Sequence, residues 1–207
     1  NNTEMRPGGG FIGLYSTLRV DKGKIEVLKV EGTETIDRQT PADWKPTPPA
    51  ILQQHLGVDR WYFRDSNWSP DFAVSADKAL ELYTGENGIA AKDIDTVVAF
   101  TPTVLERLMK ITGPFVVEGI EFTSENVTET LEYHVEYDYA RNGRSFEDRK
   151  GIVKVFMDEL LLHLKENAFA RFNDYTALLQ ELASEKHIIF YSKDPGIEKV
   201  MEALGWT

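Results

Sequence analysis

Residues 95–119 read DTVVAFTPTVLERLMKITGPFVVEG and predict a strand, a helix and a second strand in succession. The apolar run over residues 96–100 is short and bounded by polar residues, as is typical of a strand buried on both faces. Thr101 and the proline after it form a helix start, and apolar side chains then recur at helical spacing. A Gly-Pro pair at Gly113 ends the helix before the apolar strand at residues 115–117. This alternation favours an α/β or α+β fold.

The segments on either side continue the alternation. Residues 11–20 and 25–32 are β-rich and flank the Gly-containing turn DKGK, which predicts a β-hairpin. Further strands are predicted in the aromatic stretch that begins at Trp61 and in HIIFYS at residues 187–192. Helices are predicted over residues 50–56, 70–83, 123–137, 147–167 and 174–184 and from residue 195 onward. This order predicts one mixed β-sheet with helices on both faces, in a single domain that spans residues 1–207.

The composition restricts the partners and the chemistry. The 207 residues carry 34 Asp and Glu against 23 Lys and Arg, a net charge of -11, and such an excess of acidic residues disfavours nucleic acid as a partner. There is no cysteine, which excludes disulfides, thiolate metal sites and Cys nucleophiles. The four histidines lack metal-ligand spacing, so no metal site is predicted from them. No apolar stretch approaches the ~20 residues of a membrane span, and no signal peptide is visible.

Three consecutive glycines follow an arginine near the start of the chain, in MRPGGGFIG. Gly8, Gly9 and Gly10 have no side chains to pack, so we expect them to serve a close backbone approach or a positive φ angle. The alternative is a flexible tail. The stretch lacks the Lys-Ser/Thr pair of a phosphate-binding P-loop, and no strand precedes it as in a dinucleotide fingerprint.

The stretch FRDSNWSPDF places four polar residues at the junction of a predicted strand and a helix start. Arg64, Asp65, Asn67 and Asp71 crowd this junction, with Ser69 as the expected N-cap. Helix N-termini favour anions, and such junctions collect ligand sites in α/β folds. The alternative is structural, with Arg64 neutralised by Asp65 and the remaining residues capping the helix.

A second basic cluster lies in DYARNGRSFEDRK. Arg141, Arg144, Arg149 and Lys150 fall within ten residues of an acidic chain. Arg149 and Lys150 are expected in the first turn of a long helix, where the helix dipole disfavours cations unless an anion compensates. A bound anion would resolve this conflict. Carboxylates of residues 138, 147 and 148 are the structural alternative.

Three stretches together resemble a bacterial envelope family known as domain of unknown function 4012. They are NNTEMRPGGGFIG at residues 1–13, FRDSNWSPDF at residues 63–72 and the strand–helix–strand segment at residues 95–119. The final FYSKDPGIEKVMEALGW is similar to the end of that family. Members typically carry an N-terminal membrane helix and project this domain outside the cell. The resemblance therefore implies an extracytoplasmic, cell-surface domain, here part of a longer membrane-anchored protein that is trimmed before Asn1.

The order of the motifs also resembles the LytR-CpsA-Psr phosphotransferases, which move wall polymers from polyprenyl-pyrophosphate lipids onto peptidoglycan. That family has an Arg near the first strand of a hairpin, where this chain has Arg6, and a Pro-Arg-Asp turn that matches residues 63–65. A strand, a helix and a Gly-Gly-Val strand match residues 95–117. The two arginine positions that open a long helix match Arg141 and Arg149. The resemblance implies a LytR-CpsA-Psr-like fold and, if the domain is an enzyme, a phosphotransferase of that type.

The chain departs from the phosphotransferase pattern in ways that bear on catalysis. Those enzymes carry an Asp shortly after the first Arg, for metal and phosphate, where this chain has glycines and apolar residues. The Gln of their Arg-Gln pair is Lys150 here. We therefore expect binding more than transfer, and no catalytic residue is assigned.

These observations predict that Arg64 and at least one of Arg141 and Arg149 converge on one cleft that binds a phosphate-type anion, with Arg6 as a fourth and weaker member. Asp65 and Asp71 complete the list of candidate ligand-binding residues. The expected partner is a polyprenyl-(pyro)phosphate lipid or a phosphorylated wall glycan. Where Asp65 or Asp71 faces the cleft, a Mg²⁺ ion can bridge the carboxylate to the phosphate, and no other cofactor is indicated. The alternative is a non-catalytic cell-surface module for protein or wall contacts, and a third is a cytoplasmic enzyme of unrelated chemistry.

Overall fold

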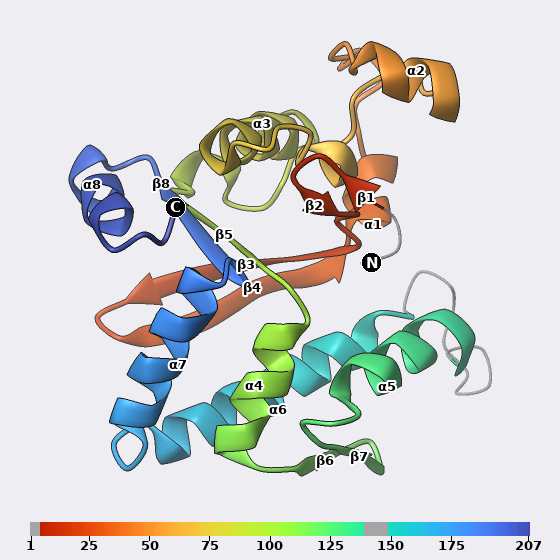
Figure 1. Ribbon diagram of the computed structural model, residues 1–207. Helices are drawn as coiled ribbons and strands as arrows, with labels where there is room; N and C mark the ends of the chain where they lie inside the picture. Colours follow the sequence, from red (N-terminus) through yellow and green to blue (C-terminus); the bar gives the residue numbers. More distant parts are fainter. Residues whose placement is uncertain (1–4, 139–148) are drawn as a thin grey trace. The chain divides into compact units, whose positions relative to one another are not determined.

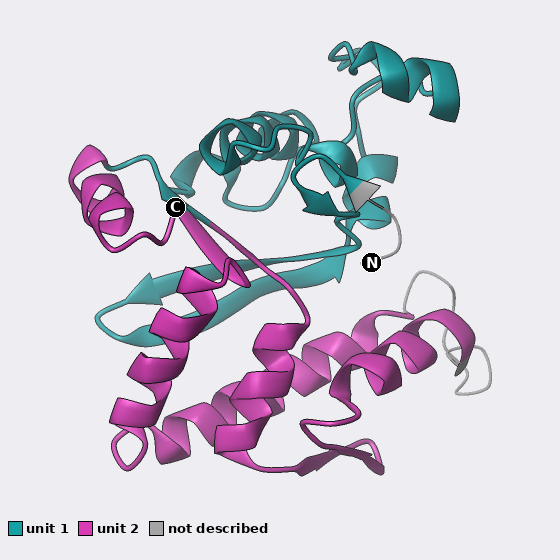
Figure 2. Cartoon of the chain, viewed as in Figure 1, with its two compact units in different colours: residues 1–97, 191–194 teal, residues 98–190, 195–207 magenta. Residues whose placement is uncertain are grey.

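The computed structural model describes residues 5–138 and 149–207 and has the predicted α+β class (Figure 1). The chain divides into two compact units (Figure 2). Unit 1 is residues 1–97 with 191–194, and unit 2 is residues 98–190 with 195–207. The expectation of one domain over residues 1–207 stays a prediction. No helix in the described part of the chain has the length and apolar character that a bilayer crossing needs.

Unit 1 holds most of the strands. Its elements are β1 (Met5–Arg6), β2 (Gly9–Gly10), β3 (Leu14–Asp21), β4 (Lys24–Gly32), α1 (Thr33–Arg38), α2 (Ala50–Leu56), the 3₁₀ turn η1 (Phe63–Asp65), α3 (Phe72–Gly85), the 3₁₀ turn η2 (Ala91–Asp93) and the first part of β5 (Thr96–Phe100). The last residues of β8 (Ile188–Ser192) also belong to it.

Unit 2 is mainly helical. Besides the remaining parts of β5 and β8, it contains α4 (Thr103–Thr112), β6 (Phe115–Val117), β7 (Ile120–Phe122), α5 (Val127–Tyr133), the π-helical turn η3 (His134–Asp138), α6 (Gly151–Asn167), α7 (Phe172–Ser184) and α8 (Pro195–Ala203). The strand, helix and strand predicted over residues 95–119 are thereby confirmed as β5, α4 and β6.

The arrangement of the strands differs from the predicted single mixed sheet. In the described residues the strands form four two-stranded sheets, which pair β1 with β2, β3 with β4, β5 with β8 and β6 with β7. Val98 and Phe100 of β5 are exposed, so this strand is not buried on both faces as expected. An apolar run predicts a strand, but it does not say which strand its edges will meet.

The predicted hairpin is confirmed in β3 and β4. Its turn places Lys22 at φ 49° and Gly23 at φ 79°. Two successive positive φ angles match the right-handed twist of the two strands, and glycine tolerates such an angle without strain. The register shifts between Thr17 and Leu18, where the ladder has a bulge.

The aromatic stretch after Trp61 is not the predicted strand but the turn η1. The Phe63 backbone N–H donates to Glu86 Oε1 at 2.9 Å, and Trp61 Nε1 donates to the Asp65 carbonyl at 2.9 Å. The Asp65 N–H closes the turn on the Tyr62 carbonyl at 3.0 Å. These bonds satisfy backbone groups that a strand would have offered to a neighbouring strand.

The start of α3 also differs from its prediction. The helix begins at Phe72 rather than at Pro70, and its N-cap is Asp71 rather than Ser69. Asp71 Oδ1 accepts the Val74 N–H at 3.3 Å. Ser69 instead braces the approach, because its hydroxyl accepts the Asp71 N–H and its carbonyl accepts the Ser75 hydroxyl.

Unit 1 has an aromatic core at the junction of α1, η1 and α3. Ile36, Phe63, Leu82 and Tyr83 are buried together, and Tyr15 of β3 packs against them. The rings of Tyr15, Phe63 and Tyr83 lie pairwise 5.3 to 5.5 Å apart. Tyr83 is further fixed by a 2.8 Å hydrogen bond between its hydroxyl and Thr17. Because η1 contributes to this core, the residues that follow Phe63 are held in place.

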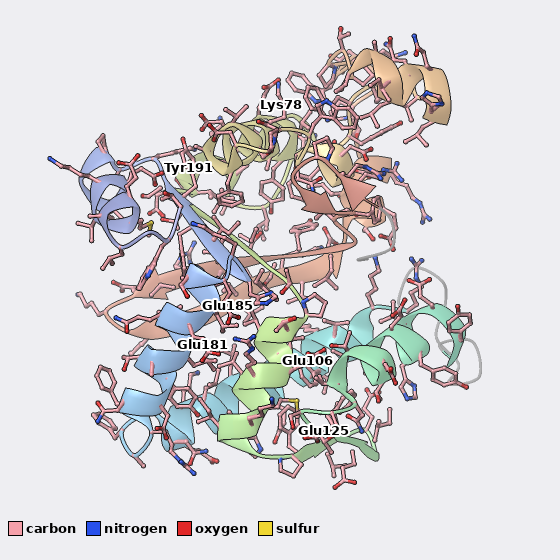
Figure 3. All side chains as sticks on the ribbon, viewed as in Figure 1. Lys78, Glu106, Glu125, Glu181, Glu185 and Tyr191 are labelled. Atoms are coloured by element: carbon pink, nitrogen blue, oxygen red, sulfur yellow. The ribbon has the colours of Figure 1, made fainter. Side chains whose placement is uncertain are left out.

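Unit 2 has its own core and surface network. Val104 of α4 packs with Leu178 and Leu182 of α7, while Phe115, Phe122 and Phe156 form a ring cluster. On the surface, Arg107 pairs with Glu181 at 2.8 Å and with Glu185 at 2.7 Å, and both glutamates are labelled in Figure 3. These contacts hold α4 against α7.

Candidate anion-binding site

The first arginine of the predicted site is buried against a carboxylate. Arg6 Nε donates to Asp65 Oδ1 at 2.8 Å, and the two side chains are 9% and 4% exposed. The Arg6 guanidinium also lies 5.4 Å from the centre of the Phe11 ring. A charge pair so far removed from water holds together only when both charges are present.

The glycines after Arg6 explain how its strand reaches this position. Gly8 donates its N–H to the Asn67 carbonyl at 3.0 Å, and Asn67 Nδ2 donates to the Gly10 carbonyl at 2.8 Å. A Cβ on Gly8 would lie 2.7 Å from the Asn67 oxygen, and Gly9 has a φ of 125°. The expected close approach and positive φ are therefore confirmed for Gly8 and Gly9.

Replacement of Gly8 by Ala is expected to lower the free energy of unfolding by about 1–3 kcal/mol, because the added Cβ meets two backbone oxygens. Those oxygens, of Asn67 and Ser69, would lie 2.7 and 2.8 Å away. Urea unfolding of the variant measures the loss. Gly13→Ala is the matched control, because its Cβ would find nothing closer than 3.9 Å. Equal stability of the two variants would contradict the close approach.

The second arginine is held from two sides but remains partly accessible. Arg64 Nε lies 2.7 Å from Asp37 Oδ2, and the guanidinium carbon lies 4.8 Å from the centre of the Tyr62 ring. The Arg64 side chain is 34% exposed, whereas Asp37 is buried. The structural alternative in which Arg64 pairs with Asp65 is therefore wrong, since Asp65 faces Arg6 and Arg64 faces Asp37.

Behind Arg64, two buried carboxyl groups contact each other. Asp37 of α1 is 5% exposed, and Glu86, directly after α3, is 0% exposed. Glu86 Oε1 accepts the Phe63 N–H, while Glu86 Oε2 is buried without a hydrogen-bond partner among the described residues. The Asp37 carboxyl lies close enough for the two charges to interact. Two carboxyl groups in such contact share a proton, because two adjacent buried negative charges repel each other.

Glu86 is the member of this pair that holds a proton more firmly. Burial, and then the Asp37 charge, raise the pKa of Glu86 to about 8. Burial also raises the pKa of Asp37, but the Arg64 charge opposes that rise. The pair titrates as a unit and carries one negative charge at neutral pH. The local charges then balance, with Arg6 opposite Asp65 and Arg64 opposite the carboxyl pair.

The structure brings together three of the six predicted site residues, namely Arg6, Arg64 and Asp65. Asp71 lies on the same segment and acts as the N-cap of α3. Arg149 belongs to unit 2, where its Nη2 lies 3.8 Å from Glu136 Oε1. Arg141 lies outside the described residues.

Sequence reasoning missed the two carboxyl groups that complete the cluster. Asp37 stands beside Arg38 in a short helix and resembles an ordinary solvated charge. For Glu86 there was one local signal, because it follows Leu82 and Tyr83 by four and three residues and so continues the buried face of α3. A charged residue that continues a buried face indicates either a partner or a bound proton.

A hollow of about 530 Å³ lies elsewhere in unit 1. It is lined by Trp44, Asp77, Leu80, Glu81, Thr84, Gly85 and Lys193. Tyr191, labelled in Figure 3, donates its hydroxyl to Asp77 at this face of α3. Arg6, Arg64 and Arg149, the described arginines of the predicted site, do not line this hollow. No group of three or more metal-ligating side chains occurs among the described residues, and the bridging Mg²⁺ stays a prediction.

Comparison with known families places this cluster in context. The family model described as "Protein of unknown function (DUF4012)" matches residues 1–135, a range that includes every residue of the cluster around Arg64. No curated protein and no solved structure matches the chain. The resemblance to the LytR-CpsA-Psr phosphotransferases stays a prediction. Because the match covers well over half of the 207 residues, the chain belongs to the DUF4012 family.

Proposed function

We propose that unit 1 is the binding part of an extracytoplasmic envelope domain and that Arg64 binds the phosphate of a polyprenyl-(pyro)phosphate lipid or a phosphorylated wall glycan. The setting of Arg64 carries this proposal. Its Nε lies 2.7 Å from Asp37 and its guanidinium carbon lies 4.8 Å from the centre of the Tyr62 ring, yet the side chain is one third exposed. Neither terminal nitrogen makes a hydrogen bond to another described residue. A guanidinium held in this way can give two parallel hydrogen bonds to a phosphate.

We propose binding without transfer. Asp65, which follows Arg64, is buried and occupied by Arg6. The acidic residue that the phosphotransferases carry after their first arginine is replaced here by Pro7 and the glycines. The extracytoplasmic location and the membrane anchor rest on the resemblance to envelope proteins.

A second candidate is a cell-surface module for protein or wall contacts. The observation that favours it is that Arg6 and Arg64, the two arginines of the predicted site in unit 1, face carboxylates, so that their charges are largely compensated. The hollow on α3 also lacks these arginines. In this case Arg64 would stabilise the fold, and phosphate compounds would not bind.

Calorimetric titration with a soluble polyprenyl-phosphate analogue, such as geranyl phosphate, tests the proposal. We expect Arg64→Gln to weaken binding by about 1.5–3 kcal/mol, the range for a hydrogen bond to a charged group. Arg19→Gln is the matched control, since Arg19 lies in the same unit on the exposed surface of the hairpin and makes only a 3.3 Å contact with Glu26. Geraniol has the lipid chain without the phosphate, and a sugar 1-phosphate has the phosphate on a sugar. Tighter binding of geranyl phosphate than of the sugar 1-phosphate indicates a lipid ligand, and the reverse order indicates a glycan. Failure of the unsubstituted chain to bind any phosphate compound would overturn the proposal in favour of the second candidate.

A further inference from the structure

We propose that phosphate and a proton bind to unit 1 together, with the proton held on Glu86 while the anion occupies Arg64. Loss of that proton weakens phosphate binding, so the site releases its ligand as the pH rises. This inference rests on the proposed function, because the linkage exists only if Arg64 binds the anion.

The geometry connects Glu86 to Arg64 through one residue. Glu86 Oε1 accepts the N–H of Phe63, the residue directly before Arg64, at 2.9 Å, and the Glu86 carboxyl lies close enough to Asp37 for the two charges to interact. Asp37 in turn lies 2.7 Å from Arg64 Nε. Glu86 and Asp37 are both buried, so water screens little of the interaction between their charges and Arg64.

The charge of the carboxyl pair decides how strongly Arg64 attracts an anion. With one proton the pair carries a single negative charge, which Arg64 balances. When Glu86 loses its proton, the pair carries two negative charges beside one guanidinium, and the cluster repels a phosphate. Asp37 also attracts the guanidinium more strongly in that state, because the proton no longer draws on its carboxylate.

Two of the carboxylates around the pair have cationic partners of their own in unit 1. The groups on the elements packed around the pair are Arg64 and Asp65 of η1, Arg6 of β1, Glu34 and Arg38 of α1 and Glu31 of β4. Asp65 pairs with Arg6 at 2.8 Å, and Glu31 pairs with Lys29 at 3.0 Å. When Asp37 and Glu86 lose the proton that they share, Arg64 therefore faces an excess of negative charge.

The coupling between phosphate binding and protonation of Glu86 is reciprocal. A bound phosphate must therefore also hold the proton on Glu86 more firmly. If the anion raises the pKa of Glu86 by about one unit, the affinity changes about tenfold between the protonated and deprotonated states. This reciprocity provides two independent measurements, one on the ligand and one on the carboxyl group.

The first measurement is the ratio of the dissociation constants of the unsubstituted chain and of Glu86→Gln for inorganic phosphate, followed from about pH 6 to pH 9. Gln is a neutral mimic of protonated Glu, and the titration of phosphate itself cancels in the ratio. We expect a ratio near 1 at low pH that rises to about tenfold at high pH. Glu81→Gln, on the exposed face of α3, is the control and should give a constant ratio near 1.

The second measurement needs no variant and covers the case in which Glu86→Gln does not fold. The ¹³C shift of the Glu86 carboxyl, followed by NMR, should titrate at higher pH when phosphate is saturating. Binding with a constant ratio, or a Glu86 titration that phosphate does not move, would overturn the proton linkage and leave the anion site standing. No phosphate binding at any pH would instead overturn the proposed function.

Discussion

Asp65→Asn is expected to lower the free energy of unfolding by about 3–5 kcal/mol, the cost of removing one partner of a buried ion pair. The substitution keeps the size of the side chain but removes the negative charge opposite Arg6, which is 2.8 Å away and only 9% exposed. Urea or thermal unfolding followed by circular dichroism measures the change.

Two further variants identify the cause of that loss. Asp71→Asn makes the same chemical change six residues away at an exposed N-cap, where Asn serves as well as Asp, and should change stability by less than about 0.5 kcal/mol. The double variant Arg6→Met with Asp65→Leu removes both charges and should recover most of the stability. A loss below about 1 kcal/mol for Asp65→Asn would contradict the buried pair.

Glu86→Gln is expected to remove a large part of the pH dependence of stability. Folding raises the pKa of Glu86 from 4.5 to about 8, so the folded chain keeps a proton that the unfolded chain loses. That contribution is fully present below about pH 4.5 and is lost as the pH rises toward 8. Each unit by which the pH rises in this range lowers the free energy of unfolding by up to about 1.4 kcal/mol. Gln does not titrate, so the variant avoids this loss, and its side chain can still accept the Phe63 N–H and donate to Asp37.

Denaturant unfolding at about pH 5 and about pH 8 measures this effect. The difference in the free energy of unfolding between Glu86→Gln and the unsubstituted chain should change by about 2–4 kcal/mol in favour of the variant between about pH 5 and about pH 8. Glu81→Gln on the exposed face of α3 should run parallel to the unsubstituted chain. Identical pH slopes for Glu86→Gln and the unsubstituted chain would show that Glu86 is not protonated in the fold.

Local patterns predicted the elements whose causes are local. The Lys22–Gly23 turn and the helix that ends at Gly57 both follow from backbone preferences of single residues, and both are present. The aromatic stretch after Trp61 is not a strand because its backbone groups bond elsewhere, as where the Phe63 N–H donates to Glu86, 23 residues later in the chain. The pairing of strands failed for the same reason, since the partner of a strand edge is set by tertiary contacts.

In the candidate site, too, local sequence features predicted some residues, whereas tertiary contacts determined the others. Arg6, Arg64 and Asp65 could be selected because arginines stand out in an acidic chain and lie next to glycines and turn residues. The partner of each arginine could not be predicted, because Asp65 pairs with a residue 59 positions away rather than with its neighbour. Asp37 entered the site only through the packing of α1 against η1, which leaves no mark in the local sequence.

The binding of phosphate by Arg64 is tested most directly by NMR of the arginine Nε–Hε groups during titration with geranyl phosphate. We expect the Arg64 signal to shift and saturate, with Arg19 on the exposed hairpin unmoved, because Arg64 is held in place with its terminal nitrogens available, whereas Arg19 directs a terminal nitrogen at Glu26. An Arg64 signal that stays fixed while the ligand is in excess, or one that moves no more than Arg19, would contradict an anion site at this residue.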